Sequence, residues 1–147
     1  MREALAQARL ADKNDEVPVG AVLVHNQRII ARAHNQVETL QDATAHAEMI
    51  CLTMGSEALS NWRLLECTLY CTMEPCSMCM GAMFLSRIKR LVWGAPDLRH
   101  GANGSWVDLT RKPHPTHTLA ITSEVLAPEC AALMQNFFQR RRDAKRD

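Results

Sequence analysis

The sequence lacks several features that would assign it to a well-known class. No apolar run approaches the roughly 20 residues of a membrane-spanning helix. The first residues, Met1-Arg2-Glu3-Ala4, show no signal-peptide pattern and fit an amphipathic helix. The glycines are not followed by the Gly-Lys-Ser/Thr of a phosphate-binding loop, and no internal repeat, linker or low-complexity segment is present. We therefore expect no membrane association and no P-loop nucleotide site.

Length and composition indicate one globular domain. The 147 residues are enough for one domain with a proper core and too few for two, so we expect a single domain over residues 1–147. The hydrophobic content of 47% and charged content of 22% are those of a soluble globular protein. Six cysteines without a secretion signal suggest a reducing compartment, with thiols free or bound to metal. The sequence thus predicts a cytoplasmic protein.

The net charge of +1 is unevenly distributed along the chain. Residues 139–147 carry a net charge of +3, so the rest of the chain carries −2. Such a basic terminus is either a solvated tail or an arm that contacts phosphates. Composition alone favours the solvated tail.

Hydrophobic patterns and turn residues predict an α/β layered domain. The expected elements, in chain order, are a helix over 1–13, a hairpin of strands 21–24 and 28–33, a polar loop ending near Thr44, a helix over 45–54 that stops at Gly55, a short helix or turn over 57–61, a strand over 68–72, a helix over 76–86, strands over 90–94 and 118–122, and a helix over 129–142. The helix between strands 68–72 and 90–94 makes them a parallel pair. Residues 95–117 form a long irregular loop, and loops of this length are usually functional. The loop contains His100, His114 and His117, which we interpret as surface histidines.

Two short motifs carry the chemistry, namely His46-Ala47-Glu48 and Pro75-Cys76-Ser77-Met78-Cys79. One histidine and two cysteines provide three zinc ligands, which leave the fourth tetrahedral position open as in catalytic zinc sites. Water at that position has its pKa lowered toward about 7, and Glu48 is the natural proton carrier. We therefore predict one zinc ion per chain, held by His46, Cys76 and Cys79.

Helix geometry supports this ligand set. Cys76 and Cys79 are three residues apart, so on a helix both thiols lie on one face. Pro75 suits the first turn of that helix, and His46 should lie near the start of another, with Asp42 or Thr44 as its cap. A structural zinc site would need a fourth ligand, for which Cys51, Cys67 and Cys71 are candidates. We expect all three to be core cysteines instead.

The H-x-E and P-C-x-x-C motifs together are the signature of the zinc deaminases. The chain resembles the cytidine-deaminase superfamily, and most closely the bacterial tRNA-specific adenosine deaminases. The resemblance runs nearly end to end and includes Val17-Pro18-Val19-Gly20-Ala21-Val22-Leu23-Val24, Thr44-Ala45-His46-Ala47-Glu48, Thr68-Leu69-Tyr70, Glu74-Pro75-Cys76, Ser86-Arg87-Ile88, Gly94-Ala95-Pro96-Asp97, Glu129-Cys130-Ala131-Ala132-Leu133 and Phe137-Phe138. It implies a three-layer α/β/α sandwich around a five-stranded mixed sheet, and a homodimer.

The same resemblance implies zinc-dependent hydrolytic deamination of adenosine to inosine at the wobble position of a tRNA anticodon. Zinc-activated water would attack C6 of the flipped-out adenine, and Glu48 would move the proton to N1 and then to the leaving amino group. Carried over residue by residue, the resemblance assigns contact with the flipped base to Asn35 and backbone beside it to Ala47. Asp97 would lie near the sugar of a neighbouring nucleotide. The terminal helix that meets the anticodon stem-loop would present Phe138, Arg141 and Arg142.

The chain departs from the family pattern in one loop, and two other functions stay open. Pro96 stands where the family commonly has a basic residue, and Arg99-His100 where it often has Lys-Thr. One alternative is a deaminase of a free base or nucleoside, of cytosine or guanine type, which would need neither the basic tail nor Asp97. The other is a zinc-stabilised RNA-binding module without catalysis. Glu48 argues against that module, because a structural site needs no carboxylate that is not a ligand.

Overall fold

The fold is built on one five-stranded mixed sheet, which we describe from a computed structural model covering residues 1–146. Asp147, the last residue of the basic tail, lies outside the described residues. The elements, in chain order, are α1 (Arg2–Lys13), β1 (Gly20–His25), β2 (Arg28–His34), α2 (Val37–Leu40), α3 (Ala47–Leu59), β3 (Cys67–Met73), α4 (Ser77–Leu85), β4 (Arg90–Ala95), β5 (Ala120–Thr122) and α5 (Ala127–Ala144). The strand order is β2-β1-β3-β4-β5.

The sheet combines an antiparallel and a parallel half. β1 pairs antiparallel with both β2 and β3, whereas β3, β4 and β5 are parallel to one another. The predicted hairpin and the predicted parallel pair around α4 are therefore confirmed. Residues 20–23 of β1 and 91–95 of β4 are buried, which agrees with their continuous apolar sequences because both faces of these strands are covered.

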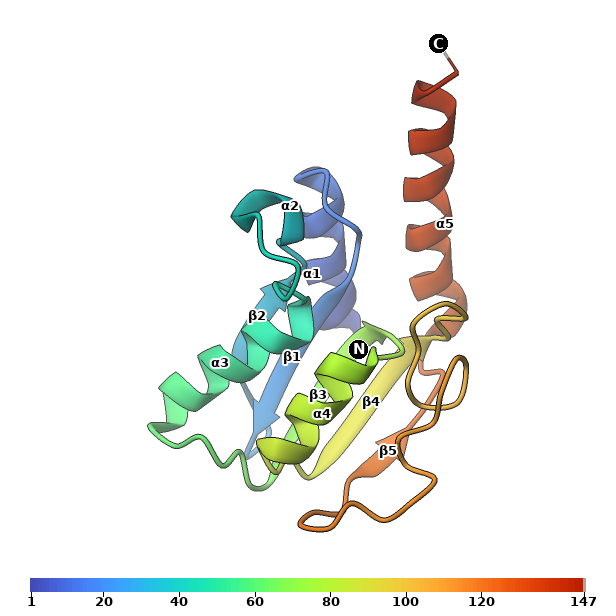
Figure 1. The fold of residues 1–147 in the computed structure, drawn as a ribbon. Helices are drawn as coiled ribbons and strands as arrows, with labels where there is room; N and C mark the ends of the chain where they lie inside the picture. The colour runs from blue at the N-terminus through green and yellow to red at the C-terminus, as the bar shows by residue number, and fades with distance from the viewer. Residues whose placement is uncertain (147) are drawn as a thin grey trace.

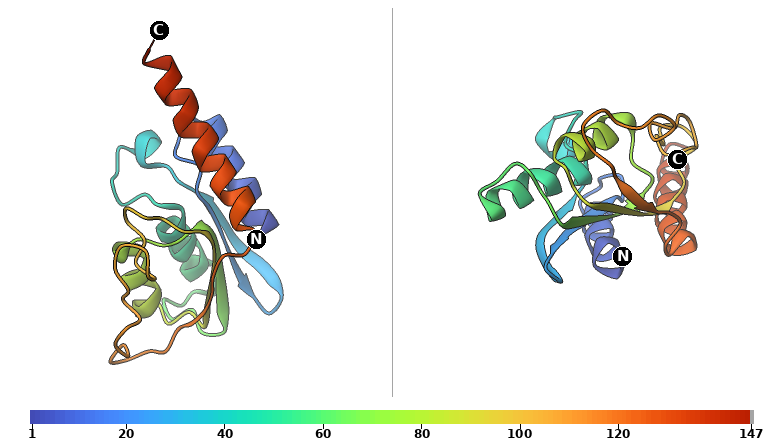
Figure 2. Two further views of the ribbon diagram at one scale, coloured as in Figure 1. Left: turned by 90° about the vertical axis from the view of Figure 1, so that its right-hand side faces the viewer. Right: turned by 90° about the horizontal axis from the view of Figure 1, so that it is seen from below.

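Helices cover both faces of the sheet (Figures 1 and 2). α3 and α4 pack together on one face, and α1 and α5 lie side by side on the other. This is the predicted three-layer α/β/α sandwich. The C-terminal part of α5 extends beyond the sheet (Figure 1). No helix within residues 1–146 has the length and hydrophobicity to cross a membrane.

The helix α3 differs from its prediction. It does not stop at Gly55 but continues to Leu59, and Ser60 ends it in the left-handed conformation. Gly55 instead allows close packing, because an added Cβ would lie 2.2 Å from Cδ2 of Leu23 on β1 and would displace that methyl group. The short helix predicted over 57–61 is the last part of α3 and the turn that follows it.

The other differences are small. Part of the predicted polar loop after β2 forms the short helix α2. α5 begins two residues earlier than expected, and β5 is limited to three residues. The methionines of α4 pack into the core as expected, with Met80 and Met83 fully buried. Cys51, Cys67 and Cys71 are also fully buried.

Candidate functional site

Two helix starts bring the predicted metal ligands together. His46 is the N-cap residue of α3 and Cys76 is the N-cap residue of α4. Nδ1 of His46 lies 3.6 Å from Sγ of Cys76 and 3.5 Å from Sγ of Cys79. The positive ends of both helix dipoles thus face one point, which favours bound anionic ligands such as thiolate.

The predicted caps are wrong in detail. Neither helix has a side-chain hydrogen bond at its N-cap. Asp42 accepts hydrogen bonds from the backbone and hydroxyl of Thr44, within the loop that leads to α3. Pro75 lies one residue before the N-cap of α4 rather than in its first turn. His46 and Cys76 therefore keep their side chains directed at each other instead of capping their own helices.

The donor set fits a zinc ion. The ligand atoms of His46, Cys76 and Cys79 all lie within 4.8 Å of one another. The hydrogen bond from the Cys79 thiol lowers the pKa of Cys76 to about 4, and His46 also stabilises this thiolate. The interaction with Cys76 raises the pKa of His46 despite burial. The interaction with Cys76 and burial raise the pKa of the Cys79 thiol. Cys76 therefore favours its thiolate form, and binding of a divalent metal would displace the remaining protons.

No fourth protein ligand joins this set within the described part of the chain. The thiol of Cys51 donates to the carbonyl of Ala31 at 3.7 Å, and that of Cys71 donates to the carbonyl of Met73 at 3.2 Å. Burial raises the pKa of Cys51 to about 12 and that of Cys67 to about 11, so both stay protonated. The arrangement agrees with an open, catalytic type of site.

Glu48 lies next to the metal ligands without belonging to them. Its side chain is 4% exposed, and Oε2 accepts a hydrogen bond from Sγ of Cys79 at 3.6 Å. Burial raises the pKa of this carboxyl above its ordinary value. A carboxyl with a raised pKa can take up and return a proton near neutral pH.

A cavity of about 550 Å³ opens over these groups. Its wall includes His46, Glu48 and Cys76 and four of the residues predicted to bind substrate, namely Asn35, Ala47, Asp97 and Phe138. Asn35 and Ala47 are buried, whereas Phe138 is 41% exposed at the rim. Segments far apart in sequence thus meet in one cavity, namely the loop after β2, the start of α3, the loop after β4, and α5.

The two predicted basic residues of α5 do not line this cavity. Arg141 donates to the backbone carbonyl of Asp15 at 2.8 Å, forms an ion pair with the Asp15 carboxylate, and covers the ring of Phe137. Arg142 donates to Gln139 Oε1 on the same helix at 2.7 Å. Both guanidinium groups lie on the exposed part of α5, farther along the helix than Phe138.

The structure also adds two buried carboxylates, Glu16 and Glu74, to which the sequence alone assigns no role in the site. The cavity wall further contains Arg99 and His100, from the loop in which the chain departs from the family pattern. Of the other loop histidines, His114 stacks on Phe84 and His117 lies 2.6 Å from the carbonyl oxygen of Ile88. Neither of these two lines the cavity.

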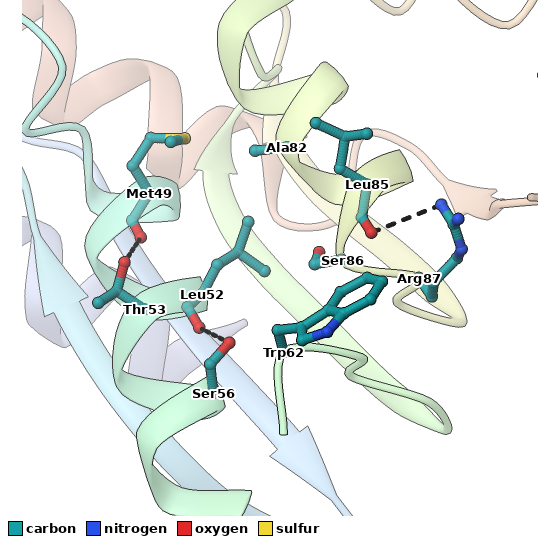
Figure 3. A pocket seen from close by; sticks show the side chains of 9 residues that line it. All are labelled: Met49, Leu52, Thr53, Ser56, Trp62, Ala82, Leu85, Ser86 and Arg87. Carbon is teal, nitrogen blue, oxygen red and sulfur yellow. Dashed lines mark hydrogen bonds between the residues drawn. The ribbon is translucent and has the colours of Figure 1, made fainter. Parts of the chain in front are cut away.

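A second, shallower cavity of about 360 Å³ lies between α3 and α4 on the outer side of the molecule (Figure 3). Trp62 and Leu85 border it and are 54% and 65% exposed. Its floor is largely apolar, with Met49, Leu52 and Ala82 pointing toward the opening.

Comparison with known proteins agrees with this geometry. Residues 1–95 match the family described as the cytidine and deoxycytidylate deaminase zinc-binding region. A tRNA-specific adenosine deaminase from Bacillus subtilis is 44% identical over 99% of this chain and 91% of its own length. The chloroplastic tRNA(adenine(34)) deaminase of Arabidopsis thaliana is 52% identical over 96% of this chain, which spans only 12% of that longer protein.

A solved structure from a study of A-to-I editing by tRNA:A34 deaminases at the wobble position of transfer RNA is also similar. It superposes with a TM-score of 0.87 at 44% identity, over 90% of this chain and 96% of the other. The chain belongs to the cytidine-deaminase superfamily, in the branch formed by the tRNA-specific adenosine deaminases.

Proposed function

We propose that this protein converts adenosine to inosine at the wobble position of a tRNA anticodon. The observation that carries the proposal is the buried Glu48 beside an open three-ligand metal site at the floor of one cavity. The names of the similar proteins support the choice of tRNA over a free base or nucleoside. The non-catalytic alternative does not explain why a buried carboxylate lies beside the ligands but outside the ligand set.

In the proposed reaction, three residues bind the metal and Glu48 transfers protons. His46, Cys76 and Cys79 would hold zinc, which when bound activates water by lowering its pKa toward about 7. Glu48 accepts the proton of the attacking water and delivers it to N1 of the adenine as C6 is attacked. Glu48 then takes up the second proton from the hydroxyl now bonded to C6 and delivers it to the exocyclic amino group. The C6–N bond breaks, ammonia leaves and the C6 carbonyl of inosine remains. Glu48 thus begins and ends the reaction in the same state.

Recognition of the base is assigned to the inner wall of the cavity. The side-chain amide of Asn35 offers a donor and an acceptor, which suits the polar edge of a purine. Its backbone is held by a hydrogen bond to Val19 at 3.0 Å, and the residue is 7% exposed. Ala47 has no bulky side chain, so the start of α3 leaves room for the base beside Glu48.

Recognition of RNA is assigned to the rim. Asp97 can accept a hydrogen bond from a ribose 2′-OH, which distinguishes RNA from DNA. The exposed ring of Phe138 can stack on an unpaired base of the anticodon loop. Arg141 and Arg142 continue along α5 toward solvent, where they would meet phosphates. The ion pair of Arg141 with Asp15 then orients this side chain before RNA binds.

The reaction can be tested by incubating the protein with an anticodon stem-loop RNA and, separately, with free adenosine. We expect inosine and ammonia from the RNA alone. Glu48→Gln should retain zinc and the fold but lower kcat by at least roughly 10²–10⁴-fold, since a general acid–base group is lost. Full inosine formation by this variant would refute the proton-transfer role, and turnover of free adenosine alone would favour the nucleoside alternative.

We also propose that the protein forms a homodimer through the outer side of α3 and α4. The α3–α4 cavity and its exposed Trp62 and Leu85 give this side a largely apolar surface (Figure 3). Exposed apolar surface of this kind is typical of interaction sites. A second copy of the chain would cover it and would place two active sites on one assembly.

A further inference from the structure

Glu74 is a buried carboxylate that takes no part in the chemistry proposed above. Glu74 is 2% exposed and lies between the end of β3 and the metal ligand Cys76. No ion pair involves Glu74 within residues 1–146. A buried charge without a partner is costly, so hydrogen bonds must stabilise this carboxylate.

All four hydrogen bonds to Glu74 come from one loop. Oε2 accepts from the backbone N–H groups of Asn103 at 2.9 Å and Ser105 at 3.2 Å. Oε1 accepts from the backbone N–H of Asp97 at 3.3 Å and from the hydroxyl of Ser105. An ionised carboxylate has about four acceptor positions, and here each meets a donor. The Glu74 side chain thus connects the two ends of the segment 97–105 through hydrogen bonds.

The backbone around Glu74 holds the same loop. The N–H of Ala102 donates to the carbonyl of Pro75 at 2.8 Å, and Cys76 forms an isolated antiparallel bridge with Gly101. A Cβ at Gly101 would lie 2.3 Å from Oε2 of Glu74, so the loop packs directly against the carboxylate. Residues 74–76 therefore support a metal ligand and the loop at once.

The loop places three side chains on the wall of the active-site cavity: Asp97, Arg99 and His100. Oδ1 of Asp97 accepts the backbone N–H groups of Arg99 at 3.0 Å and His100 at 3.2 Å, which fixes the carboxylate relative to the loop. The position of the loop relative to Cys76 then decides where Asp97 stands with respect to the reacting base. Glu74 makes the side-chain connection between the two.

We propose that Glu74 is a positioning residue that holds Asp97 against the ribose of the nucleotide beside the target adenosine. This inference rests on the proposed function, because it assumes that Asp97 contacts that ribose. Glu74 itself touches neither substrate nor metal in this role. It acts on discrimination between ribose and deoxyribose through the placement of Asp97.

The substitution Glu74→Gln separates this role from general support of the loop. A glutamine keeps one acceptor oxygen and replaces the other by a donor NH₂ group. The least costly orientation puts the NH₂ group at the Oε1 position, because the Ser105 hydroxyl can rotate and accept from it. The oxygen then still binds the N–H groups of Asn103 and Ser105, but the N–H of Asp97 faces another donor. Asp97 is thus the residue that the variant releases.

The test compares wild type, Glu74→Gln, Asp97→Asn and the double variant on an anticodon stem-loop RNA. A second substrate carries 2′-deoxyribose at the nucleotides flanking the target adenosine. We expect Glu74→Gln to keep its zinc and to lose roughly 10- to 100-fold in kcat/KM on the all-ribose RNA, because small misplacements of binding groups have effects of this size. The preference for ribose should fall to that of Asp97→Asn. In the Asp97→Asn background, Glu74→Gln should change kcat/KM by less than about twofold.

Two further variants complete the design. Glu66→Gln removes an exposed carboxylate that pairs with Lys89 at 2.7 Å, and this matched control should leave kcat/KM and ribose preference unchanged. Ser105→Ala removes one donor to Glu74 and leaves the three N–H donors, so it should reduce ribose preference in the same direction but less. This variant serves as the test if Glu74→Gln does not fold.

The outcomes separate this inference from the proposed function. An equal loss for Glu74→Gln in both backgrounds, loss of zinc, or unchanged ribose preference would overturn the positioning role while wild type still forms inosine. A wild-type protein that forms no inosine in the RNA would refute the proposed function, and the role of Glu74 with it.

Discussion

Removal of the Glu16 carboxylate should release α2 from the wall of the active-site cavity. Glu16 follows α1, is 1% exposed and lines the cavity. Its two oxygens accept the backbone N–H groups of Thr39 at 2.6 Å and Glu38 at 3.2 Å. α2 has only four residues, and a single helical turn does not persist without such support.

The size of the effect follows from the two hydrogen bonds. A hydrogen bond to a charged group contributes at least about 1.5 kcal/mol, so Glu16→Ala should lower the free energy of local opening of α2 by about 3 kcal/mol. This corresponds to roughly 100-fold faster hydrogen exchange at the amides of Glu38 and Thr39, measured by NMR. Glu16→Gln keeps one acceptor and should show a smaller acceleration. Unchanged exchange in Glu16→Ala would refute the reasoning.

The same site has a defined pH dependence. Burial raises the pKa of Glu16, but the hydrogen bonds from Thr39 and Glu38 outweigh burial and hold the pKa below its ordinary value. Because the pKa is lower in the folded than in the unfolded state, the carboxylate stabilises α2 above its ordinary pKa of about 4.3. This stabilisation is lost as the pH falls through the folded-state pKa. Glu16→Gln should lack this pH-dependent stabilisation of α2. If the variant shows the same pH dependence of local opening as wild type, the stabilisation does not come from the Glu16 carboxylate.

Further predictions concern the metal, the RNA and the oligomer. His46→Ala and Cys79→Ala should each be purified without stoichiometric zinc, and metal analysis that finds zinc retained would contradict the ligand set. Zinc binding should release protons and weaken as the pH falls, because the raised pKa of Cys79 keeps its thiol protonated; calorimetry in buffers of different ionisation enthalpy measures this. Arg141→Ala should weaken RNA binding and reduce the slope of log K against log salt by about 1. Trp62→Glu should yield monomers in analytical ultracentrifugation, and an unchanged dimer would exclude the α3–α4 surface as the interface.

The metal site could be predicted from sequence because its ligands lie in two short motifs of the chain. Cysteine and histidine are scarce residue types with specific chemistry, and their spacing relative to a proline limits where their side chains can point. The parallel arrangement of β3 and β4 followed equally directly from the helix between them. What local pattern could not show was where α3 ends. Gly55 resembles a helix terminator, yet it lies within α3, where an added Cβ would displace the packed methyl group of Leu23.

The walls of the cavity were harder to predict for a physical reason. Glu16 and Glu74 bind backbone N–H groups, which nearly every residue possesses. The residue types in the sequence therefore do not indicate which groups these carboxylates bind. These partners also lie between 22 and 31 residues away along the chain. A carboxylate that organises a loop therefore looks, in sequence, like any other acidic residue. In this fold the residues of the reaction are recognisable from motifs, whereas those that shape the cavity are revealed only when chain segments meet. Changes in substrate preference can then arise at Glu16 or Glu74 while the metal-binding motif remains intact.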